Sequence, residues 1–269
     1  MFKLIFWGVR GSVPSPGKET SYFGGNTTCI TIENEKTLII VDAGTGIRNV
    51  GKYVEEKGFK KIRILFTHYH WDHLQGLPFF GPIFNPKYQI DIYGKRNVSN
   101  VLSLQMKQPF FPADYKNLPS KINHRKIMPQ FCIDDILVET IENNHPSGCV
   151  GMRFTCNDKK IVFMTDNELS ATAPATDRKS FIKFVKGSVI FIHDSQYTDV
   201  ELKTKRGWGH STFDEVIALA EDAGINHAIF THHDPMRSDL ILKEIIAEKS
   251  AKHRKLRLSA ARENLEIKI

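Results

Sequence analysis

The sequence lacks any apolar run long enough to cross a membrane. Its longest runs, LIIV at 38–41 and VIFI at 189–192, are the length of a strand, whereas a membrane helix needs about 20 apolar residues. The first residues, MFKLIFWGVRGS, have no extended apolar region and no small-residue cleavage site, so they are not typical of a secretion signal. We therefore expect a cytoplasmic protein that makes no membrane contact.

Cysteine is scarce, and neither sign of charge is in large excess. Cys29, Cys132, Cys149 and Cys156 form no CxxC pair, which predicts buried free thiols rather than disulfides. The formal net charge of +7 favours an anionic substrate or partner, and leaves nucleic acid possible without indicating it specifically. Many cations crowd the segment 248–257, EKSAKHRKLR, for which a solvated helix end is preferred over a phosphate-binding patch.

Apolar, β-rich runs alternate with segments of helical periodicity, which predicts an α/β layered domain. Helices are expected at about 46–57, 211–223 and 238–249. Ser211 and Asp214 resemble a capping box for the second helix, and Gly224 would end it. The runs that predict strands are FKLIFW, CITIE, TLIIVDAG, KIRILFTH, YQIDIYG, DILVETIE, CVGMRFTC, KIVFMTD, SVIFIHD and HAIFTHH.

The segment at about 107–133 is rich in proline and polar residues and interrupts this alternation. Irregular insertions of this length are often lids or binding loops, and Phe110, Phe111 and Pro112 would give this one an apolar tip. An ordinary surface loop whose aromatic side chains tuck into the core is equally compatible with the sequence. We expect one domain over 1–269 that contains this insertion.

The segment THYHWDHLQG at 67–76 carries three histidines and an aspartate within six positions. It follows the expected strand KIRILF, so His68 and His70 continue its period of two and share a side. Asp72 and His73 come after the chain begins to turn and can reach a second point. A catalytic metal takes about three protein ligands, so the segment predicts two ions whose remaining ligands come from elsewhere.

Three further candidate ligands follow apolar strands. They are His145, Asp166 and His232. His233 competes with His232 within THHDP, and we prefer His232 because it directly follows the strand. Asp234 either orients a ligand imidazole or belongs to the turn before proline.

These residues resemble the metallo-β-lactamase fold superfamily, whose signature THxHxDHxxG is met by Thr67, His68, His70, Asp72, His73 and Gly76. The resemblance covers nearly the whole chain and implies an αββα sandwich, in which two mixed β-sheets are flanked by helices. It also implies that Asp42 ends an early strand. It implies two sets of ligands, His68, His70 and His145 for one ion and Asp72, His73 and His232 for the other, with Asp166 bridging them.

The segment GWGHSTFDEVIALAEDAGINHAIFTH at 207–232 is similar to the His-Ser-Thr segment of tRNase Z and its phosphodiesterase relatives. That similarity implies that His210 protonates the leaving oxygen and that Asp194 orients it, although HDSQYTDVE at 193–201 meets the family's second motif only loosely. Helix capping is the alternative role of His210. Asp166 also stands where true zinc β-lactamases place a cysteine, which favours phosphodiester hydrolysis.

The N-terminal segments FWGVRGSVPSPG and YFGGNTTC resemble cyclic-nucleotide-degrading members of the same branch. Backbone N–H groups in the glycine turn at 24–26 can point at an anion, so Gly25 and Asn26, with Arg10 or Ser12, are the candidate substrate contacts. By the same likeness we expect a homodimer.

The tRNA-gripping arm of tRNase Z lies between the residues that correspond to His145 and Asp166, which only 20 residues separate here. We therefore predict a dinuclear phosphodiesterase acting on a small nucleotide such as a cyclic nucleotide, in which Asp72 and Asp166 hold the attacking hydroxide between two ions about 3.5–4 Å apart. A tRNase Z-like endoribonuclease and a thioester or lactone hydrolase are the alternatives. Histidine and aspartate ligands suit Zn²⁺ first, and also Mn²⁺, Fe²⁺ or Ni²⁺.

Overall fold

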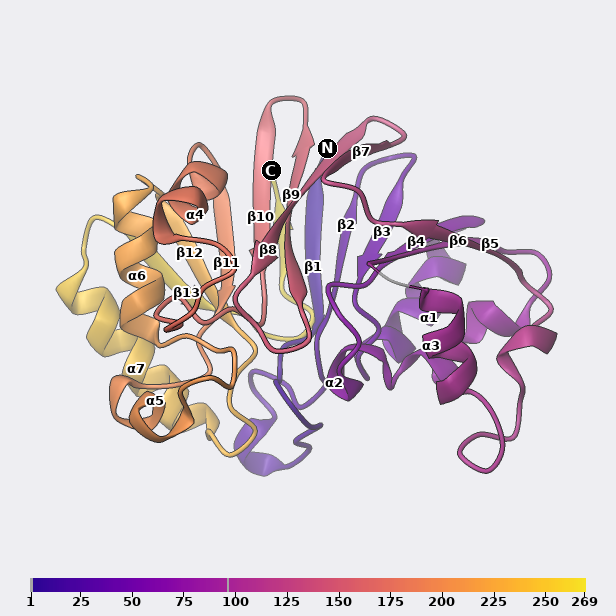
Figure 1. Cartoon of the computed structure of the whole chain (residues 1–269), viewed down its shortest axis with the longest axis horizontal. Helices are drawn as coiled ribbons and strands as arrows, with labels where there is room; N and C mark the ends of the chain where they lie inside the picture. Colours follow the sequence, from indigo (N-terminus) through magenta and orange to yellow (C-terminus); the bar gives the residue numbers. More distant parts are fainter. Residues whose placement is uncertain (1, 96) are drawn as a thin grey trace.

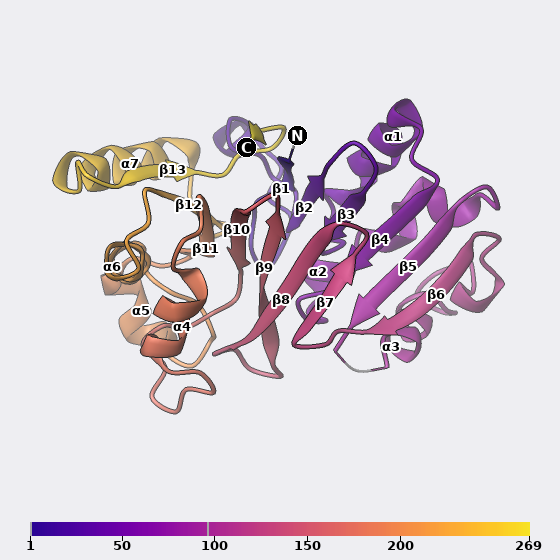
Figure 2. The same cartoon turned by 90° about the horizontal axis from the view of Figure 1, so that it is seen from above.

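Two seven-stranded mixed sheets pack face to face, and helices cover the outer face of each (Figures 1 and 2). The computed structural model describes residues 2–95 and 97–269. The first sheet has the order β14-β1-β2-β3-β4-β5-β6, and the second has the order β13-β12-β11-β10-β9-β8-β7. This is the predicted αββα sandwich.

Each sheet is half antiparallel and half parallel. In the first sheet, β3 to β6 are parallel, and the strands are β1 Lys3–Gly8, β2 Cys29–Glu33, β3 Leu38–Val41, β4 Lys61–Leu65, β5 Gln89–Gly94, β6 Lys121–Lys126 and β14 Glu266–Lys268. In the second sheet, β10 to β13 are parallel, and the strands are β7 Gln130–Ile133, β8 Ile136–Asn143, β9 Cys149–Cys156, β10 Lys159–Met164, β11 Ile190–Asp194, β12 His227–Thr231 and β13 Arg257–Ala260. Parallel strands bring their carboxyl ends to one edge, where loops carry functional residues.

Three apolar clusters account for the layers. One lies between the sheets and includes Phe6, Phe154 and Phe163. The second lies under α1 Ile47–Lys57 and α3 Val98–Gln105, and the third under α4 Arg178–Val185, α6 Phe213–Asp222 and α7 Asp239–Lys252. The short helix α2 Trp71–Leu74 adds Leu74 to the second cluster and lies between the two halves (Figure 1). The short helix α5 is Asp199–Lys205. None of the described helices has the length and apolarity that crossing a membrane requires.

The segment 107–133 is more regular than expected. Residues 121–126 and 130–133 form β6 and β7, so the irregular part is shorter and contains one 3-10 turn, Tyr115–Asn117. Phe110 is 75% exposed, whereas Phe111 packs against the cluster under α1 and α3.

Two smaller expectations were also wrong. The capping box of α6 uses Thr212 and Glu215, one residue after the predicted pair, because the Thr212 hydroxyl accepts from Glu215 N while the Glu215 carboxylate accepts from Thr212 N. Cys132 is exposed on β7, whereas the other three cysteines are buried, and all four are free.

Candidate metal centre

The predicted ligands all lie where strands of the two sheets end. His68 and His70 follow β4, and α2 carries Asp72 and His73. From the second sheet, His145 follows β8, Asp166 follows β10 and His232 follows β12. The site is therefore built by both halves of the sandwich.

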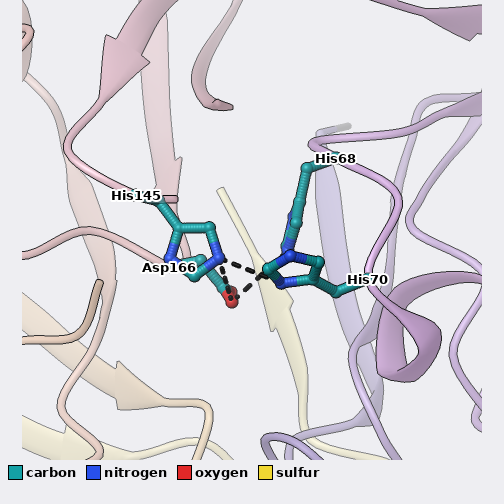
Figure 3. A group of neighbouring side chains, drawn as sticks. All are labelled: His68, His70, His145 and Asp166. Carbon is teal, nitrogen blue, oxygen red and sulfur yellow. Dashed lines mark hydrogen bonds and ion pairs between the residues drawn. The ribbon is translucent and has the colours of Figure 1, made fainter. Parts of the chain in front are cut away.

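The first set of side chains, called here the His68 group, consists of His68, His70 and His145 (Figure 3). His145 Nε2 lies 3.1 Å from His70 Nδ1. Asp166 Oδ2 lies 3.6 Å from His68 Nε2 and 3.8 Å from His145 Nε2. One ligand atom from each of these four residues lies within 4.8 Å of the others, so a single cation fits among them.

The second set, called here the His232 group, consists of Asp72, His73 and His232. Asp72 Oδ2 lies 3.2 Å from His73 Nε2 and 3.1 Å from His232 Nε2. The other Asp166 oxygen, Oδ1, lies 3.2 Å from His73 Nε2 and 3.4 Å from His232 Nε2. Asp166 thus directs one oxygen to each group, as a bridging carboxylate does.

The donor atoms fit divalent metal ions. Among the described residues, buried His68 Nε2 has no hydrogen-bond partner, which is costly for a polar atom unless something else satisfies it. Both groups offer imidazole nitrogens and carboxylate oxygens, the ligand types of zinc and of several other first-row metals.

Protein groups fix the other nitrogen of four imidazoles. His73 Nδ1 donates to Asp42 Oδ2 at 2.8 Å, and Asp42 also accepts from the backbone N–H and hydroxyl of Thr67. His145 Nδ1 donates to the Gly209 carbonyl at 3.1 Å, and His232 Nδ1 donates to Gln196 Oε1 at 3.0 Å. His68 Nδ1 lies 3.1 Å from the Thr67 hydroxyl. Such partners set the tautomer and aim the free nitrogen at the metal.

Burial and charge separate the two groups electrostatically. Burial lowers the pKa of all three rings of the His68 group, to about 4 for His145, so these rings are neutral and offer lone pairs. Burial acts the same way on His73 and His232, but Asp166 and Asp72 outweigh it and raise the pKa of both rings. The His232 group therefore holds protons at positions that a cation would take.

The carboxylate of Asp166 is poised for ligation. Its burial acts to raise the pKa, but His232, His73 and His68 outweigh that effect and hold the pKa well below its usual range. The side chain is therefore ionised and available as a bridging ligand throughout the physiological range.

His233 points away from the centre. Its Nε2 donates to the Ala261 carbonyl at 2.9 Å, and its ring packs on Phe23. The structure therefore brings His232, and not His233, to the other ligands. Asp234 is a turn residue, because its Oδ1 accepts from the backbone N–H of Met236.

His210 lies beside the ligands and is buried. Its ring stacks on His232 with centroids 4.9 Å apart, and one of its nitrogens lies within 4.8 Å of ligand atoms of Asp166 and His232. His210 Nδ1 is 3.3 Å from Asp194 Oδ2, so the predicted pairing with Asp194 is present in the geometry. Asp194 also accepts from the backbone N–H groups of Asn167 and Ser211, which holds it rigidly.

Three of the four candidate substrate contacts do not reach the centre. Arg10 is fully buried and donates to the carbonyls of Gly24, Asp234 and Arg237. Ser12 alone of the four reaches the centre, where its backbone N–H donates to Asp72 Oδ2 at 2.8 Å.

The glycine turn binds an anion, but that anion belongs to the chain. The backbone N–H and side-chain amide of Asn26 both donate to the Glu263 carboxylate, at 2.7 and 2.9 Å. Gly25 packs against the backbone of Ser15. Arg10, Gly25 and Asn26 therefore hold the N-terminal loop in place through contacts within the chain.

Residues that the sequence did not single out also shape the site. Gln196 orients His232. Glu168 is 3% exposed, and its carboxylate accepts from the backbone N–H groups of Gly207 and Gly209, which fixes the loop before His210. A Cβ on Gly11 would lie 2.3 Å from His232 Nδ1, so only glycine fits there. Gly11 and Gln196 lie within the quoted segments FWGVRGSVPSPG and HDSQYTDVE, but their contacts with His232 follow only from the fold.

A family model described as "Beta-lactamase superfamily domain" matches residues 37–233. The chain is similar to ribonuclease Z of Clostridium tetani (strain Massachusetts / E88), with 24% identity over 293 aligned residues that cover 89% of this chain and 90% of the relative. That alignment is longer than the chain of 269 residues, so the relative has segments that this chain lacks.

Solved structures share the fold. The metallo-beta-lactamase fold protein YhfI from Bacillus subtilis aligns with a TM-score of 0.74 and 16% identity over 99% of this chain and 98% of its own. A diphosphatase from the PhnP family aligns with a TM-score of 0.71 and 17% identity, over 100% of this chain and 98% of its own. Human tRNase Z, short form, aligns with a TM-score of 0.67 and 16% identity over 99% of both chains.

Proposed function

Because the chain belongs to the beta-lactamase superfamily, we propose that it is a hydrolase that uses two divalent metal ions to cleave phosphodiesters, with RNA as the substrate class. The observation that carries the proposal is Asp166, whose two oxygens face two separate groups of imidazoles. The His68 group with Asp166 would hold one ion, and the His232 group with Asp166 the other. Such ions polarise a phosphoryl oxygen and lower the pKa of a bound water.

The side chains divide the remaining work. Asp72 Oδ2 accepts from the Ser12 backbone N–H, so this oxygen has a fixed direction beside the His232 group. His210 has Nδ1 against Asp194, which leaves Nε2 to give a proton to the leaving oxygen.

The relatives support RNA over other phosphodiesters. The Clostridium tetani relative is named a ribonuclease Z, and its alignment covers most of both chains. The net charge of +7 also favours a polyanion. The reading as a tRNase Z-like endoribonuclease is therefore our main proposal, in place of the small-nucleotide reading that the sequence favoured.

Hydrolysis of a small nucleotide, such as a cyclic nucleotide, is the second candidate. The hairpin of β9 and β10 turns through only Asn157 and Asp158, so no arm extends between His145 and Asp166 to grip a large RNA. The likeness to a diphosphatase of the PhnP family supports the same alternative through the fold alone.

Metal analysis combined with kinetics on bis-p-nitrophenyl phosphate tests the reaction. We expect two metal ions per chain, and at least a 10³-fold loss of kcat/KM in His68→Ala and Asp166→Ala with the fold retained. His210→Ala should keep both metals and lose about 10²- to 10⁴-fold in kcat. His253→Ala, which alters a partly buried histidine paired with Glu221 and outside the candidate metal centre, is the control. Absence of metal after loading with zinc or manganese would refute the proposal, and an undiminished His210→Ala rate would remove that residue from it.

A substrate panel separates the candidates. It contains a precursor tRNA, a linear RNA, cyclic AMP, cyclic GMP, cyclic oligonucleotides and S-lactoylglutathione. Preferred cleavage of RNA supports the main proposal, and preferred cleavage of a cyclic nucleotide supports the second. Turnover of the thioester alone would contradict both.

A further inference from the structure

A groove with a volume of about 620 Å³ lies where the edge strands of the two sheets meet α7. β13 ends the second sheet and β14 ends the first, so the groove runs over the open edges of the sandwich. Its floor is apolar and includes Phe23, Leu258 and Leu265. None of its lining residues belongs to the candidate metal centre.

Cations from three different elements converge on this groove. Lys243 comes from α7, Arg257 from β13, and Arg262 from the loop that follows β13. Lys243 Nζ lies 3.8 Å from the centre of the Tyr22 ring, and the Arg262 guanidinium lies 5.5 Å from the same ring. The Tyr22 ring therefore contacts two positive charges, those of Lys243 and Arg262.

These three cations lack a counter-charge within the described part of the chain. No described carboxylate oxygen lies within 4.0 Å of the charged nitrogens of Lys243, Arg257 or Arg262. The groove's one acidic lining residue, Glu266, is instead shared between Lys3 at 3.7 Å and Lys268 at 3.6 Å. Positive charges that gather in a concave surface without carboxylate partners favour the binding of an anion.

One loop connects this groove to the candidate metal centre. Its start contacts the centre, where the Ser12 backbone N–H donates to Asp72. Its later part lines the groove with Tyr22 and Phe23, whose backbone N–H groups donate to the Asp239 carboxylate at 2.7 and 3.2 Å. A bound strand that passes along this loop would contact both places.

We propose that this groove, formed by Lys243, Arg257, Arg262 and Tyr22, is an exosite for the phosphodiester backbone of an RNA substrate. The inference rests on the proposed function and adds to it where the RNA is held. The cations of the groove have no carboxylate partner among the described residues, so they are free to contact RNA phosphates. The aromatic ring is flanked by cations, so the groove binds phosphates and does not read bases.

The test compares two double variants with the same change in charge. Lys243→Glu/Arg262→Glu alters the groove, and Arg254→Glu/Lys255→Glu alters exposed cations of the same region that do not line it. Fluorescence anisotropy of the metal-loaded proteins with a labelled 20-nucleotide phosphorothioate RNA gives affinity against salt concentration. Turnover of bis-p-nitrophenyl phosphate is measured in parallel.

We expect the groove variant to bind RNA at least 10-fold more weakly at low salt, with the slope of log K against log salt reduced by about 1.4, or 0.7 for each phosphate that the variant no longer neutralises. The control should stay within about 3-fold of the unmodified chain, and both variants should retain bis-p-nitrophenyl phosphate turnover. Equal losses in both variants would overturn the exosite, because net charge alone would explain them. The exosite would also be overturned if the groove variant bound RNA normally but had a lower mass in sedimentation than the unmodified chain. The groove would then be a contact with a second copy of the chain. If the unmodified, metal-loaded chain does not hydrolyse bis-p-nitrophenyl phosphate at all, that result counts against the proposed function and not against the exosite.

Discussion

Replacing Gly209 by alanine is predicted to disable half of the candidate metal centre. A Cβ at this position would lie 1.9 Å from His145 Nδ1, whereas real Cβ contacts are not shorter than 3.0 Å. The imidazole must therefore retreat by about 1 Å, and its hydrogen bond to the Gly209 carbonyl must break or bend. A misplacement of this size in a catalytic site costs about 100-fold in rate.

Gly207→Ala is the matched control for this prediction. Gly207 has φ +83°, close to the +89° of Gly209, so alanine meets the same backbone strain of about 1–2 kcal/mol at either position. A Cβ on Gly207, however, would have no neighbour within 4 Å among the residues that the structure describes. Any difference between the variants therefore reports the displacement of His145.

Metal content after dialysis and kcat/KM for bis-p-nitrophenyl phosphate measure that difference. We expect Gly209→Ala to lose about one metal ion per chain and at least 100-fold in kcat/KM, while Gly207→Ala keeps both ions. The reasoning is refuted if the two variants have the same metal content and rates within about 3-fold of each other.

Three other substitutions or conditions give distinct outcomes. Gln196→Ala should weaken binding of one metal ion about 10- to 100-fold, measured by chelator competition, whereas Gln196→Glu keeps an acceptor for His232 and should bind nearly normally. His233→Ala should keep both metals but unfold more easily, by about 1–3 kcal/mol in urea, and loss of a metal would contradict its placement. Burial, and then Arg257, lower the pKa of His227 to about 4, so protons prefer the unfolded chain and stability is lost as pH falls from about 6.5 to 4. In the metal-free protein, His227→Gln should therefore reduce the loss of unfolding free energy between pH 7.5 and 5 by roughly 1–2 kcal/mol, and an identical pH dependence would disprove the assignment.

The strands that could be predicted are those with buried, apolar sequences. Each of the ten apolar runs contains a strand, because a strand covered on both faces needs apolar residues throughout. The four described strands that were missed, β6, β7, β13 and β14, each lie at an end of their sheet. β6, with the sequence KINHRK, and β7 are mostly exposed. Edge strands of this kind carry charge and lack the periodicity that predicts a strand.

The predicted ligands come together because each follows an apolar strand or occupies the signature segment. What the sequence could not show is which polar groups pair with one another at long range. The N-terminal turn does present N–H groups to an anion, but that anion is Glu263, more than 230 positions away. The sequence did not predict roles for Glu168 and Gln196 for the same reason, since those roles depend on contacts that only the fold creates.

Three residues at the centre also leave their strands in an uncommon conformation. Asp42, Asp166 and His232 have φ of +61°, +56° and +55°, a region that costs a non-glycine residue about 1 kcal/mol or more. This conformation turns each side chain away from the sheet and toward the shared edge. Hydrogen bonds from Thr67 to Asp42, from Thr165 to Asp166 and from His232 to Gln196 hold the three turns in place. Because Asp42 belongs to one sheet and the other two residues belong to the second, the strain is maintained only while the sheets stay packed. The geometry that separates the His68 group from the His232 group is thus set by the core between the sheets, since Asp166 can face the His68 group and His73 only in the assembled sandwich.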